Sequence, residues 1–260
     1  MTGDPDASAI LRSRCREGGL DVNIVEFAAA AAVVAFAAAV QGTIGLGFNI
    51  VAVPVMSLIN PLLAPVPQLI LSLPQSIAAL VREHGEVDRS GVFWILVGRL
   101  PGAVLGFWLL ALATDRVLDL LIGALVLIAV VILATGFRFR RTRSVEFGAG
   151  VFAGVSSYVS SIGGPPVALL YSRDEGPTVR ATLGLIFTIG VTVTIIARTI
   201  GGDMTGRDVA LGVGLLPAAG LGFLLSSWLK GRISRDHLRA AIFVLSATAA
   251  TALLLRAALA

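Results

Sequence analysis

The stretch QGTIGLGFNIVAVP, residues 41–54, places three glycines within six positions directly after a run of apolar residues. That run, residues 22–40, is long and apolar enough for a membrane helix. Glycine weakens a helix, so Gly42, Gly45 and Gly47 predict an interruption inside an apolar region. Non-helical backbone at membrane depth is tolerated only where it is buried in protein or lines a water-filled cavity. The stretch therefore predicts a specialised site within a membrane domain.

The composition of the chain indicates a membrane protein built from helices. Of the 260 residues, 56% are hydrophobic and 14% are charged, and the mean hydropathy is +0.91, whereas soluble domains are roughly 25% charged. The apolar runs are continuous, which excludes an outer-membrane barrel with strands of alternating polarity. A single cysteine, Cys15, excludes an intrachain disulfide and a thiolate metal cluster. We therefore expect an all-α polytopic membrane protein.

The apolar segments form two sets of five, and each set opens with a glycine-broken pair. The last three segments of each set approach the ~17 to 25 residues that cross a bilayer, so we expect six full spans. The segments 45–59, 145–158 and 163–172 are too short to cross a bilayer directly. The two sets comprise residues 22–40, 45–59, 64–81, 91–113 and 117–136, and then 145–158, 163–172, 179–198, 207–229 and 236–259.

The two sets resemble each other in sequence. LPGAVLGF at 100–107 and LPAAGLGF at 216–223 are identical at six of eight positions, and the glycine breaks fall at a similar spacing. We infer a duplication with two inverted-topology repeats, each a glycine-broken helical hairpin plus three transmembrane helices, or about 8–10 helical segments in all. The predicted organisation is a polar tail at 1–21, a first repeat at 22–136, a basic cytoplasmic linker at 137–144 and a second repeat at 145–260.

Basic residues in short loops predict the orientation, because such loops stay on the cytoplasmic side. Two clusters of arginine and lysine, within residues 138–143 and 230–239, therefore predict cytoplasmic loops. Between them lie the second broken pair and two full spans, so the broken pair crosses the membrane either not at all or twice. Each repeat then crosses an odd number of times, which predicts opposite orientations for the two repeats and both termini on the outer side.

The two glycine-rich breaks are the predicted binding site for an anion. In transporters built from inverted repeats the substrate lies near the midplane between helix ends, where free N–H groups and the helix dipole attract negative charge. The alternative roles are close helix packing for the glycines and bonding to their own helix for the serines. The predicted substrate-binding residues are Gln41, Gly42, Thr43, Gly45, Gly47, Asn49, Ser160, Ser161, Gly163, Gly164 and Pro165, with Ser156 and Ser157 as further donors.

Two residues outside the breaks complete the predicted site. Arg99 lies near the middle of the segment 91–113, where an arginine costs at least about 2.5 kcal/mol and usually faces the protein interior. It serves as a counter-charge for an anion, donates to carbonyls freed by Pro101, or extends to the membrane interface. Gln75, together with Ser72, either faces the same cavity or packs between helices.

Three motifs resemble those of the sulfite exporter TauE/SafE family. GLGFNIVAVPVMSLINP at 45–61 resembles the first glycine-rich motif of that family, although Phe48 and Asn49 stand where glycine is frequent. SSIGGPPVALLY at 160–171 resembles its second-repeat motif, and GPTVRATLGLIF at 176–187 resembles its downstream segment. The resemblance covers about residues 24–258. It implies an inner-membrane anion transporter associated with sulfite or organosulfonates.

Several absences narrow the function further. No Asp or Glu lies deep within a predicted span, which disfavours a cation substrate. His84 and His237 lie in loops without further ligands nearby, so neither a metal site nor a cofactor is expected. The chain lacks the phosphate-binding loop of ATPases, and it lacks the intramembrane histidine that a serine protease would need. We therefore expect no enzymatic activity.

The sequence thus predicts a multi-pass secondary transporter of the inner (cytoplasmic) membrane that exports sulfite or an organosulfonate by alternating access. The alternatives are a passive anion channel and a membrane assembly partner without transport of its own. The expected partners are a small inorganic or organosulfur anion and the lipid bilayer, with no role for nucleic acid. The sequence leaves open whether the protein forms a homodimer.

Overall fold

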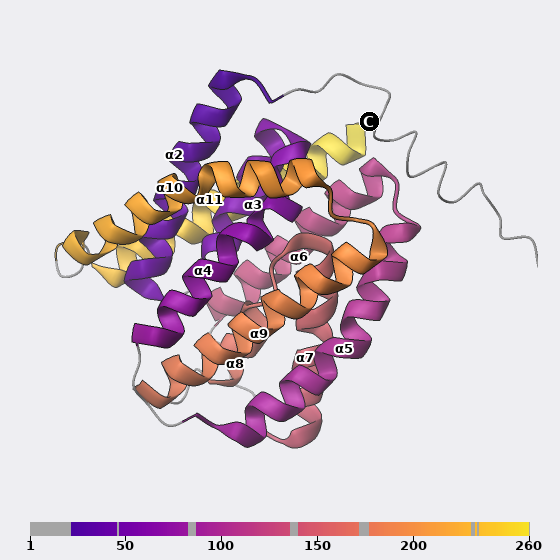
Figure 1. Ribbon diagram of the computed structural model, residues 1–260, viewed down its shortest axis with the longest axis vertical. Coiled ribbons are helices and arrows are strands. Elements are labelled where there is room, and N and C mark those ends of the chain that lie inside the picture. Colours follow the sequence, from indigo (N-terminus) through magenta and orange to yellow (C-terminus); the bar gives the residue numbers. More distant parts are fainter. Residues whose placement is uncertain are drawn as a thin grey trace, which may run out of the picture.

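The computed structural model describes residues 22–45, 47–82, 87–135, 140–171, 177–229, 232 and 234–259, and these ranges form helices and connecting turns without any strand (Figure 1). The predicted polar tail at 1–21 lies outside the described residues. The helices are α2 (Ile24–Ile44), α3 (Phe48–Ile59), the short 3-10 helix η1 (Pro61–Leu63), α4 (Val66–Arg82), α5 (Arg89–Ala111), α6 (Asp115–Thr135), α7 (Arg143–Ser160), α8 (Pro165–Leu170), α9 (Pro177–Gly201), α10 (Gly206–Leu229) and α11 (Arg235–Leu259).

Seven helical segments among the described residues are long and apolar enough to cross a membrane: α2, α4 with the preceding η1, α5, α6, α9, α10 and α11. The predicted all-α polytopic membrane fold is therefore confirmed. The seventh segment is α2, which continues through Gly42 to Ile44 instead of ending near residue 40. Gly42 lies within α2 and packs against α10, where a Cβ would clash with the hydroxyl of Ser226. The interruption therefore begins at Gly45.

The first glycine break joins α2 and α3 into a hairpin. The amide of Asn60, which follows α3, donates a hydrogen bond of 3.0 Å to the carboxylate of Glu26 in the first turn of α2. The far end of α3 therefore returns to the end of the molecule at which α2 begins. Asn23 and Glu26 form a capping box that fixes this end of α2.

The second break joins α7 and α8 into another hairpin. The hydroxyl of Tyr171, directly after α8, donates to Asp88 over 3.2 Å, and Arg141, just before α7, forms an ion pair with the same carboxylate. The Arg141 guanidinium also lies 4.2 Å from the centre of the Tyr171 ring. The end of α8 therefore returns to the start of α7, so each hairpin enters and leaves at one end of the molecule.

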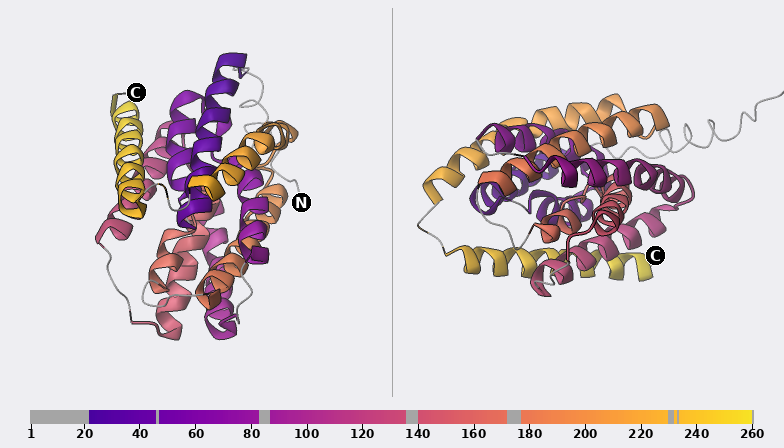
Figure 2. Two further views of the ribbon diagram at one scale, coloured as in Figure 1. Left: turned by 90° about the vertical axis from the view of Figure 1, so that its left-hand side faces the viewer. Right: turned by 90° about the horizontal axis from the view of Figure 1, so that it is seen from below.

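The two hairpins come from opposite ends and meet at their tips. The amide of Asn49, at the start of α3, donates a hydrogen bond of 2.6 Å to the carbonyl of Ser161, at the end of α7. The first turns of α5 and α7 lie at the bottom of Figure 1 and of the left view of Figure 2, whereas the start of α2 and the end of α11 lie at the top. Because α5 has 23 residues and rises about 34 Å, it runs most of the way between the two ends.

Glycines bring α5 into close contact with α7. A Cβ on Gly98 or Gly102 of α5 would clash with backbone carbonyls of α7, and one on Gly150 of α7 would clash with the carbonyl of Ile95. Small residues at intervals of four allow such backbone contact between membrane helices. The same device joins α2 to α10, where a Cβ on Gly222 would meet the carbonyl of Ala35. These contacts fix α5 against the second hairpin.

The main packing partners of the first five segments mirror those of the second five. Helix α5 packs on α7 and α9, just as α10 packs on α2 and α4. Helices α4 and α9 contact each other, and so do α6 and α11. Helix α3 lies against α11 in the way that α8 lies against α6. The main contacts of one set thus have counterparts made by the corresponding helices of the other set.

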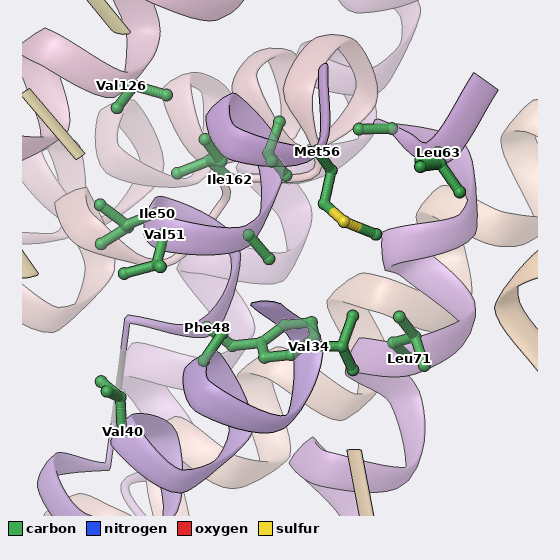
Figure 3. Close-up of a cluster of buried hydrophobic side chains, with 14 of the residues drawn as sticks. Val34, Val40, Phe48, Ile50, Val51, Met56, Leu63, Leu71, Val126 and Ile162 are labelled. Atoms are coloured by element: carbon green, nitrogen blue, oxygen red, sulfur yellow. The ribbon is translucent and has the colours of Figure 1, made fainter. Parts of the chain in front are cut away.

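Helix α3 lies in the centre of the protein core. Phe48, Ile50, Val51 and Met56 are all buried in one apolar cluster (Figure 3). A helix that is apolar on all sides is typical of a protein interior. By contrast, α5 and α10 expose large apolar side chains along one side, such as Trp108 and Leu224, as expected for helices that face lipid.

Candidate functional site

A cavity of about 90 Å³ lies between the tips of the two hairpins. Helices α4, α5 and α9 provide its remaining walls. The lining residues are Gln41, Gly47, Phe48, Asn49, Ile50, Ser72, Gln75, Ser76, Arg99, Ser157, Ser161, Ile162, Gly163, Gly164, Pro165, Phe187 and Val191.

The tip of the first hairpin depends on two glycines with positive φ. Gly45 ends α2 with φ 93°, and Gly47 precedes α3 with φ 119°. Residues other than glycine are strained at positive φ, so the reversal of the chain at these two positions requires glycine. The side-chain carbonyl of Gln41 accepts a hydrogen bond of 3.2 Å from the amide of Phe48 and thereby ties the end of α2 to the start of α3.

The start of α3 faces the cavity with its electropositive end. Gly47 has no side chain to cap the helix, and the first N–H groups of a helix have no partner within it. Asn49 and Ile50 of this first turn both line the cavity. A helix start of this kind attracts negative charge.

The tip of the second hairpin is held by Ser161. This residue ends α7 with φ 59°, and its hydroxyl donates a hydrogen bond of 2.8 Å to the carbonyl of Pro65. Helix α8 then begins with Pro165 and Pro166, which have no N–H groups to offer. The donors at the cavity therefore come mainly from α3 and from the side chains around it.

Arg99 brings a positive charge to the wall of the cavity. Its side chain is 3% exposed, and its Nη1 atom has no hydrogen-bond partner in the described part of the chain. Two glycines make room for the guanidinium, since a Cβ on Gly190 would clash with Arg99 Cζ and one on Gly163 would lie 3.1 Å from Nη2. No bond to a carbonyl freed by Pro101 is seen. Of the alternatives for Arg99, the buried position excludes extension to the interface.

A second buried arginine, Arg198, differs from Arg99 because its guanidinium is hydrogen-bonded to the protein. Arg198 of α9 is 2% exposed, but its Nε donates a hydrogen bond of 2.9 Å to the carbonyl of Tyr158 near the end of α7. Its guanidinium lies 5.0 Å from the centre of the Tyr158 ring, and the Tyr158 hydroxyl donates to Asp203 over 2.6 Å. Arg198 therefore has protein partners, whereas Arg99 retains bonding capacity for a ligand.

Nine of the thirteen predicted site residues line the cavity: Gln41, Gly47, Asn49, Gln75, Arg99, Ser161, Gly163, Gly164 and Pro165. The other four lie outside the lining. Gly42 packs against α10, and Gly45 ends α2. The hydroxyls of Thr43 and Ser160 donate hydrogen bonds of 2.8 Å to carbonyls one turn earlier in their own helices. Their predicted binding role stays a prediction.

Six lining residues were not singled out in the sequence: Phe48, Ile50, Ser76, Ile162, Phe187 and Val191. Five of these are apolar, and an apolar residue in a membrane segment carries no signal that separates a cavity wall from a lipid-facing side. Phe187 and Val191 lie one turn apart on α9, which is the only hint that they share a face.

Among the described residues, no group of three or more His, Cys, Asp or Glu side chains is placed to hold a metal ion. None of the described residues in the lining carries a carboxylate, so the net charge of their side chains is positive. The arrangement is therefore suited to bind a small anion.

A sequence model with the description "Sulfite exporter TauE/SafE" matches residues 30–253. The chain belongs to the sulfite exporter TauE/SafE family. The match covers the tips of both hairpins and every described residue that lines the cavity, and it confirms the resemblance inferred from the three motifs. TauE/SafE proteins are membrane transporters associated with anions such as sulfite, and the seven apolar segments make this chain a multi-pass member. No curated protein and no solved structure matches the chain.

Proposed function

We propose that this TauE/SafE protein is a secondary transporter that moves a small oxyanion, sulfite above all, across the inner (cytoplasmic) membrane. The observation that carries the proposal is the unpaired guanidinium of Arg99 in a cavity between two opposed hairpin tips. A buried cation without a partner is unfavourable, and a bound anion would provide the partner. The first backbone N–H groups of α3 add hydrogen-bond donors at the electropositive end of the helix.

The size of the cavity supports a small inorganic anion. A volume of about 90 Å³ lies well below the ~300 to 1,000 Å³ of pockets for drug-sized ligands. The small volume therefore favours an anion of only a few heavy atoms. An organosulfonate fits when its organic part is very small.

The mirrored packing supports the inverted repeat and, with it, alternating access. In such transporters one bundle moves against the other around a fixed midplane site. The hairpin tips provide that site, while their bases lie at opposite ends of the molecule. Transport then requires the two ends to open in turn.

Each end carries an ion-pair clamp on a hairpin. At the predicted outer end, Arg256 of α11 binds Asp119 at 2.7 Å and the carbonyl of Ser57 at 3.1 Å. At the predicted cytoplasmic end, Arg141 binds Asp88, and it binds Glu146 at 3.0 Å. Since each clamp ties a hairpin to neighbouring helices, we propose that the two clamps hold the respective ends closed.

The proposal is tested by sulfite flux into liposomes that contain the purified protein. We expect saturable uptake that speeds up when sulfite is also present on the far side, because an alternating carrier returns faster when it is loaded. Uptake without saturation or such acceleration would favour the passive channel. Uptake no faster than in protein-free liposomes would favour the assembly partner and contradict the proposal.

A further inference from the structure

Two residues that line the cavity each have a buried side-chain atom without a partner in the described part of the chain, namely Nη1 of Arg99 and Oε1 of Gln75. The other polar side chains around them are bonded to protein. Asn49 donates to Ser72 over 2.9 Å and to a backbone carbonyl of the second hairpin. Ser157 bonds to the hydroxyl of Thr194 over 3.0 Å. Each of these two residues thus has one buried side-chain atom without a protein partner, a donor on Arg99 and an acceptor on Gln75.

The orientation of the Gln75 amide is set by its own helix. Its Nε2 donates a hydrogen bond of 3.1 Å to the carbonyl of Leu71, and reversing the amide would place two oxygens against each other. The Oε1 atom is therefore the one left without a partner, in a side chain that is 6% exposed. A buried acceptor without a donor is unfavourable unless a ligand or water supplies one.

We propose that this site, given the transport function proposed above, selects an oxyanion that still carries a proton, such as hydrogensulfite. The charged oxygens of the anion bind the Arg99 guanidinium, and its hydroxyl donates a hydrogen bond to Gln75 Oε1. A fully deprotonated dianion cannot donate this bond and would bring its negative charge against the amide oxygen. An anion with a methyl group in place of the hydroxyl would leave Oε1 unpaired.

On this proposal a proton would cross the membrane on the substrate itself, without a carboxylate relay. No residue among those described in the cavity lining is acidic. The most buried carboxylate among the described residues, Glu146, lies at the base of the second hairpin and pairs with Arg141. A hydrogen-bearing substrate carries its own proton, so the cavity needs no proton acceptor that titrates.

The test compares two monoanions of nearly the same shape, hydrogensulfite and methanesulfinate, in which a methyl group replaces the hydroxyl. Calorimetric binding to the purified full-length protein is measured for the wild type, Gln75→Met and Gln68→Met. Gln68 is the matched control, since it lies two turns earlier on α4, is fully buried and has an unpaired Oε1, but does not line the cavity.

We expect the wild type and Gln68→Met to prefer hydrogensulfite, and Gln75→Met to lose that preference by about tenfold, as for one hydrogen bond to a charged ligand. The affinity for total sulfite should fall as the pH rises and hydrogensulfite loses its proton. Among the described lining residues Arg99 is the only ionisable side chain, and it stays protonated over this range. Methanesulfinate binding over the same pH range therefore controls for changes in the rest of the protein.

Two results would overturn the inference while leaving the transport proposal intact. One is a wild type that binds both anions equally, and the other is a Gln75→Met protein with an unchanged preference. A wild type in which sulfite binding strengthens as the pH rises would also overturn it, because the dianion would then be the ligand. A wild type that binds neither anion would instead contradict the proposed function itself.

Discussion

Replacement of the two buried arginines by methionine separates a ligand-binding charge from a structural one. In Arg99→Met the protein loses a buried charge that costs at least about 2.5 kcal/mol at mid-membrane depth, and the methionine keeps much of the apolar stem. We expect the ligand-free protein to be as stable as the wild type or more stable. In Arg198→Met the carbonyl of Tyr158 loses its buried hydrogen-bond donor. The aromatic ring of Tyr158 also loses its cation–π contact with the guanidinium. These losses amount to about 3 kcal/mol.

The assay is thermal unfolding of the purified proteins with and without sulfite. An anion that binds only the folded protein stabilises it by about 2.7 kcal/mol at one hundred times its dissociation constant. Truncating one side of a buried charge pair costs about 2 to 5 kcal/mol of binding, so Arg99→Met should lose most of the sulfite-induced shift. Arg198→Met should unfold at a lower temperature and retain the shift.

The reasoning fails if the two variants behave alike. An Arg99→Met protein as unstable as Arg198→Met would mean that the Arg99 guanidinium bonds to the protein. An Arg99→Met protein with the full sulfite shift would mean that the anion binds elsewhere.

Three further outcomes are expected. Gly190→Ala should weaken sulfite binding in calorimetry, because its Cβ displaces the buried guanidinium of Arg99. The control Gly220→Ala, whose Cβ meets no atom within 4 Å, should bind sulfite normally. Equal binding by both variants would contradict the assigned geometry. Burial alone would raise the pKa of the Asp88 carboxyl, but hydrogen bonds from Arg141 and a backbone N–H outweigh it and lower the pKa. The wild type should therefore lose stability as the pH falls below about 4, and Asp88→Asn should lack that component in thermal unfolding; an unchanged acid response in Asp88→Asn would refute the assignment. Arg256→Gln should increase amide hydrogen exchange in α3, most in its last turn, and should leave exchange in α8 unchanged; protection of α3 equal to that of the wild type would exclude the outer clamp.

The fold class could be predicted from the sequence because apolar length and low charge are local properties. The positions at which the glycines interrupt the helices could not be predicted in the same way. Gly42 looked like a helix breaker in the sequence, but a glycine that packs against a neighbouring helix looks the same as one that ends a helix. Only the contact with Ser226 of α10 distinguishes the two roles.

The site could be predicted where polar residues stand out against an apolar background. Arg99 and Gln75 were found in this way, since polar groups at membrane depth are costly and need a reason. The bonding states of Arg99 and Arg198 could not be predicted. They depend on which carbonyls lie nearby, and Tyr158, the partner of Arg198, is 40 positions away in sequence.

The most direct test of the central claim is a structure of the protein with selenite, a heavier analogue of sulfite that can be located by its anomalous scattering. We predict one strong selenium peak within hydrogen-bond distance of the Arg99 guanidinium and next to the first turn of α3, and no peak in Arg99→Met. A selenium peak outside the cavity that persists in Arg99→Met would contradict the assignment of the anion site.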